Sequence, residues 1–475
     1  MNLTRQNLAR RAFLKLSGGL GALTLAELNG LHAQGVGFKS YGILQQPHFA
    51  ARAKRVIRIH QIGAVSQVDT FDYKPMLEKM HGQELPPSIR GKGRLSTMSA
   101  AQSAFPLVKP ISPFKQHGQS GAWVSELFPH TAKIVDDLCF IKTLRTDHVN
   151  HDPAAKFLHT GFQLAGRPPE GAWVNYALGS ENQNLPAFVA FTSGTFSGVS
   201  HDASNWGSGL LPSQYQGVPF RSGKDPVLYV SNPDGVDMKD RRAMLDVIAK
   251  LSEAQHEISN DPEIPAKISQ YEMAYRMMTS VPEVADISNE PENVLDMYGP
   301  DVRKPGTFAR NCLLARRLAE RDVRFISIMH VAWDHHTNIV QRKPADCLAV
   351  DQPSAALVAD LKQRGLLKDT LVMWGSEFGR TSFAQGAIDV NVGRDHHGNN
   401  FTWWLAGGGV KAGFTYGETD DFSYNSVTPP VEIHDAHATM LHILGIDHEQ
   451  LTYRAQGRDF RLTDVAGRVV KDILA

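Results

Sequence analysis

The sequence predicts an α/β fold: a doubly wound, mostly parallel sheet flanked by helices. Apolar, β-branched runs of strand length alternate with amphipathic helical patterns, which is typical of parallel strands joined by helical crossovers. Clusters of acidic residues and histidines follow predicted strands, where open α/β sheets place their binding sites. We therefore expect one α/β domain over residues 36–475, with a helical insertion at residues 237–303.

The individual elements are predicted from hydrophobic periodicity. The first core strand is expected at Lys54–Gly63. Residues 73–117 are rich in Gly, Pro, Ser and Lys and are expected to form a long surface excursion. Further strands are predicted at Val323–Met329, Thr370–Trp374 and Phe401–Ala406. Helices are predicted at Leu127–Phe140, which runs into a strand, and at Thr307–Glu320, Ser354–Lys362 and Val431–Leu444.

Residues 1–35 are expected to be an export signal. The segment Ala9–Lys15 matches the twin-arginine pattern, and a stretch rich in Gly, Ala and Leu follows it. Glu27 and several glycines make this stretch too weakly apolar for a permanent membrane span. The alternative is an ordinary amphipathic N-terminal helix. The export reading predicts a periplasmic or cell-surface protein that crosses the membrane already folded.

Charge and cysteine content exclude two classes of protein. With 49 basic and 49 acidic residues the net charge is zero, whereas a nucleic-acid-binding protein is expected to carry a basic excess. Cys139, Cys312 and Cys347 form no CxxC pair and lie in apolar or helical contexts. We therefore expect three buried free thiols and neither a disulfide framework nor a cysteine zinc site.

The strongest functional signal directly follows the predicted strand Val323–Met329. Asp334, His335 and His336 lie in this strand-end loop, and carboxylate and neutral imidazole groups are common metal ligands. The ordinary role for a histidine is a surface or core position, but the adjacent pair raises the expectation of a metal site. These three residues are therefore candidate ligands.

Two similar clusters and one acidic residue extend this candidate site. Glu377 and Arg380 lie in the segment after the predicted strand Thr370–Trp374, and the pair His396 and His397 lies between two glycines. Asp69 follows the first core strand and is a further candidate ligand, although an aspartate there also suits a helix N-cap. We expect these carboxylates and histidines to converge on a metal ion.

Another set of candidates precedes a predicted helix start. Pro153 suits the first turn of a helix, and His148, Asn150 and His151 come just before it. Side chains at this position face the positive end of the helix dipole, which favours an anionic group. The alternative role for each of them is capping or loop packing.

Taken together, these segments resemble the alkaline phosphatase/sulfatase superfamily, and more closely an exported, sulfatase-like family called domain of unknown function 1501. The matching pieces are the twin-arginine start, Ser66–Asp72, Trp333–His336, Glu377–Thr381, Gly393–Gly398 and Gln456–Phe460. The resemblance covers nearly the whole mature chain and implies the superfamily's α/β fold and metal-dependent hydrolysis of sulfate or phosphate esters. The family itself has no settled reaction.

The resemblance also implies roles for single residues. Asp69 matches the first-strand carboxylate that binds metal, and His336 and His397 match histidine ligands. His151 stands where sulfatases place a cysteine or serine and phosphatases a serine or threonine, so the usual nucleophile is missing.

Two further positions depart from the superfamily pattern. Ala332 replaces the acid that usually precedes Trp333, so Asp334 would substitute for it. Glu377 resembles the aspartate of an Asp-His motif, but Phe378 stands in place of the histidine. The ligands of a first metal position, Asp334, His336 and His397, therefore look more complete than those of a second, Asp69 and Glu377, which predicts one divalent ion rather than two. Zinc, manganese and calcium are all compatible with mixed carboxylate and imidazole ligands.

Two functions follow as hypotheses. The first is an exported metal-dependent hydrolase that acts on an anionic small-molecule or polysaccharide ester. In that case His151 serves as general acid or base or as nucleophile, Asn150 orients the leaving group and Arg380 clamps an anionic oxygen. The second is a catalytically inactive protein of the same fold that binds anionic polysaccharide at the cell surface.

Overall fold

The computed structural model describes residues 42–91, 95–96, 98–194, 202–221, 226–228, 231–261 and 263–475. The segment expected to be an export signal, residues 1–35, lies outside the described residues. Within the described part of the chain, no helix is both long and apolar enough to cross a membrane.

A nine-stranded sheet forms the centre of the fold, and its strand order is β12-β4-β11-β8-β1-β7-β5-β6, with β13 paired to β4. Neighbouring strands are parallel except at β11. The strands are β1 (Arg55–Ile62), β4 (Leu138–Arg145), β5 (Phe188–Ser193), β6 (Val218–Phe220), β7 (Phe325–Val331), β8 (Thr370–Gly375), β11 (Phe401–Ala406), β12 (Phe414–Tyr416) and β13 (Val431–Glu432). This arrangement confirms the predicted mostly parallel α/β fold and its four predicted core strands.

Strand β11 is where the mostly parallel sheet departs from parallel pairing. It runs antiparallel to both of its neighbours, β4 and β8. The chain leaves β8 at the carboxyl edge of the sheet and stays on that side through the two-stranded ribbon β9 (Gly379–Ala384) and β10 (Arg394–His397). No helix carries it back to the opposite edge, so β11 starts where β8 ended and must run the other way.

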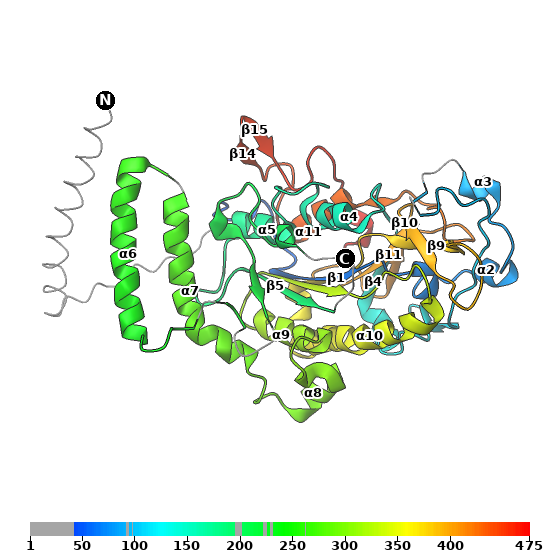
Figure 1. Cartoon of the computed structure of the whole chain (residues 1–475), viewed down its shortest axis with the longest axis horizontal. Coiled ribbons are helices and arrows are strands. Elements are labelled where there is room, and N and C mark those ends of the chain that lie inside the picture. The colour runs from blue at the N-terminus through cyan, green and yellow to red at the C-terminus, as the bar shows by residue number, and fades with distance from the viewer. Residues whose placement is uncertain are drawn as a thin grey trace, which may run out of the picture. The chain divides into compact units, whose positions relative to one another are not determined.

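Helices cover both faces of the sheet (Figure 1). Successive residues of β1 point to opposite faces, and accordingly Ile57 belongs to one core cluster and Val56 to the other. The first cluster packs against α8 (Glu292–Tyr298), α9 (Phe308–Ala319) and α10 (Ile339–Gln363), and the second against α4 (His151–Thr160), α5 (Glu170–Leu178) and α11 (Ile433–Ile443). Each layer thus buries an apolar helix face against the sheet.

Two predicted helices differ from the observed ones at their ends. Helix α10 begins at Ile339, fifteen residues before the predicted start, because Pro344 and Pro353 interrupt the sequence pattern although both fit inside the helix. The predicted helix Leu127–Phe140 is only a 3-10 helix, η2 (Thr131–Asp137), that leads into β4. The cysteines are buried and free, as predicted.

The expected helical insertion at residues 237–303 consists of α6 (Met238–Ser259), α7 (Glu263–Ala285) and α8, followed by the short 3-10 helix η5 (Pro300–Arg303). Helices α6 and α7 pack against each other as an antiparallel pair at one end of the sheet (Figure 1).

The segment 73–117 is not only a surface excursion. It contains α2 (Pro75–Lys79), α3 (Pro87–Arg90) and β2 (Phe114–His117), which pairs with β3 (Ala122–Ser125). Leu77 and Leu107 are fully buried in a small core with Phe383 of β9. The remaining strands, β14 (Tyr453–Ala455) and β15 (Arg458–Phe460), form a separate hairpin.

We predict that Gly63→Ala destabilises the protein by about 1–3 kcal/mol, because an added methyl group would overpack the end of β1. Gly63 has a φ of 109°, and a Cβ atom there would lie 2.7 Å from the backbone nitrogen of Asp334. Gly82→Ala is the matched control, since Gly82 has a φ of 81° with no heavy atom within 4 Å of the added Cβ. Urea unfolding of both variants measures the difference, and equal losses would contradict the prediction.

Candidate metal centre

The strand ends bring distant segments of the chain together at one edge of the sheet. Strands β1, β7 and β8 are parallel neighbours, so their carboxyl ends lie side by side. The loop after β7 carries Asp334 and His336, and the loop after β8 carries Glu377. Helix α4, which follows the parallel strand β4, begins with His151 at this same edge. The loops after β7 and β8 and the start of α4 therefore lie together at this edge.

Four side chains from three segments gather their ligand atoms within 4.8 Å of one another: His151, Asp334, His336 and His396. Oδ1 of Asp334 lies in the middle, 2.9 Å from Nε2 of His336 and 3.2 Å from Nε2 of His151. Nε2 of His396 lies 3.4 Å from the same oxygen. These four residues, which we call the metal centre, are only slightly exposed to solvent.

Each of the three histidine rings is oriented by a hydrogen bond at its other nitrogen. Nδ1 of His151 lies 2.6 Å from Oε1 of Glu377, and Nδ1 of His396 lies 2.5 Å from the carbonyl oxygen of Val149. Nδ1 of His336 contacts the side-chain oxygen of Gln385. Because these partners are oxygens that accept hydrogen bonds, each Nδ1 carries the proton. When only Nδ1 carries a proton, each ring presents the lone pair of its Nε2 atom to Asp334.

This arrangement of electron pairs fits a bound cation. Nε2 of His151 is buried and has no hydrogen-bond partner. Nε2 of His336 and Nε2 of His396 are only 2.9 Å apart. Lone pairs that face one another and a carboxylate oxygen repel unless a proton or a metal ion lies among them. Three imidazoles and one carboxylate are a normal ligand set for zinc or manganese, whereas calcium prefers six to eight oxygen ligands.

The charges around the metal centre keep Asp334 ionised. Burial alone would raise its pKa, but the neighbouring imidazoles of His151, His336 and His396 and the positive charge of Arg380 lower the pKa well below the usual range. Burial lowers the pKa of His396 to about 4, so that its ring is neutral at pH 7. Although burial lowers it, hydrogen bonds with Asp334 and Glu377 raise the pKa of His151, so a divalent ion at the centre would compete with a proton for Nε2 of this ring.

Asp69 was expected to be a ligand, but the structure places it in a different contact. Its two carboxylate oxygens accept hydrogen bonds from Arg394 at 2.9 and 3.0 Å. Nζ of Lys343, which is fully buried, lies 4.0 Å away. These two cationic side chains compensate the charge of Asp69, so the carboxylate needs no metal ion. This correction removes the main ligand expected for a second ion.

His335, His397 and Glu377 also lie outside the group of ligand atoms. Nε2 of His335 faces Asp346 at 2.7 Å, and Nε2 of His397 faces the carbonyl oxygen of Tyr424 at 2.8 Å. In each pair of adjacent histidines only one ring faces the centre, that of His336 in the first pair and that of His396 in the second. Glu377 instead accepts hydrogen bonds from His151, from His60 and from the backbone N–H of Gly63. It therefore orients a ligand rather than serving as one.

Arg380 does not point into open space as the anion clamp expected from the sequence. Its buried guanidinium group donates to the carbonyl oxygens of Ala64 and Arg394 and to Oδ1 of Asp334. These internal contacts leave it as a support of Asp334. Asn150 is exposed at the N-cap of α4, directly before His151, and its side chain makes no capping hydrogen bond.

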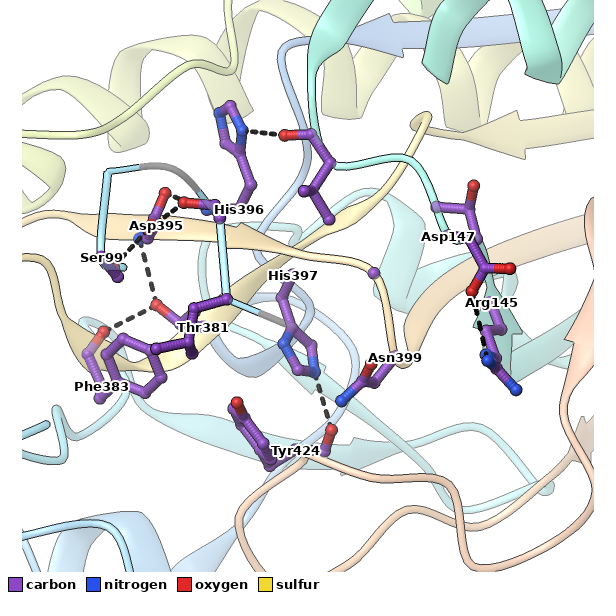
Figure 2. A pocket seen from close by; sticks show the side chains of 15 residues that line it. Ser99, Arg145, Asp147, Thr381, Phe383, Asp395, His396, His397, Asn399 and Tyr424 are labelled. Carbon is purple, nitrogen blue, oxygen red and sulfur yellow. Dashed lines mark hydrogen bonds and ion pairs between the residues drawn. The ribbon is translucent and has the colours of Figure 1, made fainter. Parts of the chain in front are cut away.

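A pocket of about 350 Å³ lies beside β10 and shares His396 with the metal centre (Figure 2). The side chains of His396 and His397 point in opposite directions from β10, and both residues line the pocket together with Asp395 (Figure 2). The hydroxyl groups of Ser96 and Ser99 donate to Asp395 in its wall. The pocket therefore borders the centre through one ligand without containing the ligand atoms of the other three.

Some residues of this region had no recognisable signal in the sequence. His60 lies in a buried strand and reads as an ordinary core residue, and Gln385 lies in a loop with no motif. His151 was expected in the reaction itself rather than among the ligands, because the resemblance placed it at a nucleophile position. Only the folded arrangement shows that its Nε2 meets the other ligand atoms.

Comparison with solved structures finds weak likenesses. A sulfatase from Pseudoalteromonas sp., PsFucS1, is 12% identical over 84% of this chain and 69% of its own, with a TM-score of 0.32. The alkaline phosphatase from the Antarctic bacterium TAB5 is 12% identical over 76% of this chain and 92% of its own, with a TM-score of 0.28. An alkaline phosphatase superfamily protein from Vibrio parahaemolyticus is 10% identical over 87% and 74%, with a TM-score of 0.35.

At the level of sequence, residues 53–474 match the family described as "Protein of unknown function (DUF1501)". No curated protein matches the chain. Because the structural likenesses are weak, we derive the function from the geometry of the metal centre.

We predict that His396→Ala removes most of the bound metal, because it deletes one of four ligand atoms. The neighbouring variant His397→Ala is the control, since the ring of His397 contacts Tyr424 and not the centre. Metal content of the purified full-length proteins, measured by elemental analysis, checks both. Equal loss of metal in the two variants would show that the centre is drawn incorrectly.

We predict that Asp69→Asn leaves the metal content unchanged but lowers the free energy of unfolding by about 3–5 kcal/mol, because it leaves the buried charge of Arg394 uncompensated. Elemental analysis and denaturant unfolding measure the two effects. A loss of metal at normal stability would instead restore Asp69 as a ligand.

Proposed function

The chain belongs to the DUF1501 family, and we propose that it is a metal-dependent hydrolase of sulfate, phosphate or related esters. The observation that carries this proposal is the convergence of three imidazole nitrogens and one carboxylate oxygen at the carboxyl edge of the sheet. Binding sites of open α/β sheets lie at that edge. The slight exposure of His151, Asp334 and His336 gives an ester group access from solvent.

A divalent ion held there would polarise an ester oxygen as a Lewis acid and make a nearby water molecule more acidic. The residues of the chain set up this chemistry. Arg380 holds Oδ1 of Asp334 in place and keeps it ionised. Glu377, Gln385 and Val149 hold the three histidine rings with their Nε2 atoms toward the ion. The site is therefore preorganised, which is the main way that a protein lowers a barrier of this kind.

His151 takes a different part from the one expected at its position. With Nδ1 bound to Glu377 and Nε2 directed at the centre, both ring nitrogens are committed. We therefore assign it to holding the ion, and assign the attack on the ester to water. Asn150, exposed next to it, remains the candidate for contact with the leaving group. The N-terminus of α4 adds a partial positive charge that favours an anionic ester at this end of the site.

The setting proposed for this reaction is outside the cytoplasm. The twin-arginine pattern at Ala9–Lys15 supports export of the folded protein to the periplasm or cell surface. Export in the folded state agrees with a metal centre assembled from segments more than 240 residues apart in the sequence, since such a centre exists only after folding. The proposed substrates are anionic small-molecule or polysaccharide esters.

One observation favours a second function, a binding protein without catalysis. Four ligands from the protein would fill all four positions of a zinc ion, and zinc sites filled in this way are usually structural, whereas catalytic sites keep one position open. The commitment of Arg380 to internal contacts also leaves no arginine from the predicted set to bind the substrate anion. In this case the protein retains anionic polysaccharide without cleaving it.

We predict that full-length protein purified without tags or added ions contains one divalent ion and hydrolyses a generic aryl sulfate or aryl phosphate. Chelation should abolish turnover, one equivalent of zinc or manganese should restore it, and Asp334→Ala should be inactive with either ion. Metal content and release of the chromogenic alcohol are the measurements. A metal-loaded wild-type protein that turns over neither ester but binds a sulfated polysaccharide would support the second function and contradict the first.

A further inference from the structure

A row of buried ionisable side chains leads from the metal centre into the interior, and none of its inner members holds the ion. It consists of Glu377, His60, His159 and Glu170, which we call the His60 network. Oε2 of Glu377 lies 3.0 Å from Nε2 of His60, and Nδ1 of His60 lies 2.9 Å from Nε2 of His159. Nδ1 of His159 lies 3.5 Å from Oε1 of Glu170. All four side chains are at most 1% exposed.

Four elements of the fold build this network. Glu377 follows β8, His60 belongs to β1, His159 lies in α4, and Glu170 is the first residue of α5. Helix α4 therefore contributes at both ends, with His151 in the metal centre and His159 in the network. Position and orientation of α4 against the sheet determine both contacts at once.

The direction of the hydrogen bonds follows from the carboxylate of Glu377, which can only accept. Nε2 of His60 therefore carries a proton and donates a hydrogen bond to Glu377. In the neutral ring Nδ1 of His60 is then an acceptor, and the N–H at Nε2 of His159 donates to it. Burial lowers the pKa of His60 to about 4, which agrees with a neutral ring. The N–H groups of His159 and His60 thus point in the same direction along the network, toward Glu377.

Glu377 receives three donors in total: the rings of His60 and His151 and the backbone N–H of Gly63. His151 and Gly63 contact Oε1 and His60 contacts Oε2, so both oxygens of the carboxylate act as acceptors. An ionised Glu377 forces the proton of His151 onto Nδ1, and this leaves Nε2 as the nitrogen that can bind an ion. The tautomer of His151 therefore depends on Glu377 and on the groups that donate hydrogen bonds to Glu377.

Stability alone does not account for the network. Burying ionisable groups is costly, and apolar side chains of similar volume are often as good or better for stability. Nε of Arg58 lies 3.4 Å from Oε1 of Glu170. The charge of Glu170 is therefore compensated by Arg58 and does not require His60. What His60 adds is the connection between this interior pair and the residue that orients His151.

We propose that His60 and His159 are positioning residues of the metal centre, which act through Glu377 to keep Nε2 of His151 directed at the ion. This inference rests on the proposed metal centre, but not on the identity of the reaction. Groups that orient metal-binding histidines typically change metal affinity by about 10- to 100-fold when they are removed.

The test compares two substitutions of His60 in the full-length protein loaded with Zn²⁺ or Co²⁺. Glutamine can place an N–H near the position of Nε2 and so preserve donation to Glu377, whereas methionine fills the volume without a donor. We expect His60→Met to weaken Zn²⁺ binding about 10- to 100-fold, measured by competition with a chelator, and to change the visible absorption spectrum of bound Co²⁺. His60→Gln should recover the wild-type spectrum and most of the affinity.

A purely structural role would give a different pattern. In that case His60→Met would lower the stability of the metal-free protein in denaturant, while the Co²⁺ spectrum stayed that of the wild type, and the proposal would be overturned. His448→Met is the matched control, because His448 is a buried histidine bonded to Thr463 outside the network. It should leave both the affinity and the spectrum unchanged.

Two further outcomes are decisive. If His60→Met does not fold, His159→Met replaces it, with a weaker loss of Zn²⁺ affinity expected and an unchanged affinity and spectrum counting against the proposal. A wild-type protein that binds one ion without cleaving any ester would refute the proposed hydrolysis, while the His60 variants would still decide the positioning role. A wild-type protein that binds neither Zn²⁺ nor Co²⁺ would refute both.

Discussion

The repulsion between lone pairs at one point of the fold constrains the whole functional region. Three Nε2 atoms and one carboxylate oxygen lie within 4.8 Å of each other, and an oxygen atom contacts the Nδ1 atom on the opposite side of each ring. In a partly buried site such a concentration of electron density is poorly screened by water. Arg380 offsets part of the charge of Asp334 from one side. A divalent cation would compensate the remaining charge, and the hydrogen bonds at Nδ1 restrain the three rings from turning away.

At the same edge of the sheet, the charge of another buried carboxylate is compensated by side chains of the protein itself. Asp69 is buried just after β1, where a carboxylate without compensation would be very unfavourable. Arg394 and Lys343 supply the positive charge from within the chain, and burial lowers the pKa of Lys343 to about 8. Arg394 comes from β10, the strand that also carries His396. One short strand therefore contributes a permanent cation to Asp69 and a ligand to the metal centre.

Hydrogen-bonding partners around the centre come from elements that also shape the core. Gly63 brings the end of β1 against the backbone of the loop after β7 and donates to Glu377. Nε1 of Trp333 donates to the side chain of Gln61, which anchors this loop directly before Asp334. Displacement of either contact would move ligands and core together. The position of the metal centre is thus coupled to the stability of the sheet.

The sequence by itself determined the fold class and the region of the site. Strand and helix periodicity is a local property, and therefore β1, β7, β8 and β11 were predicted correctly, whereas the antiparallel direction of β11 depends on the path of the preceding ribbon. Adjacent histidines marked the right loops, but residue type does not state which ring of a pair turns inward. Tertiary structure alone selected His336 over His335 and His396 over His397, because side-chain direction depends on backbone conformation and on distant partners such as Gln385, Asp346 and Tyr424. It also assigned Asp69 to Arg394, because a buried charge takes the nearest compensating group, and sequence separation does not show which group that is.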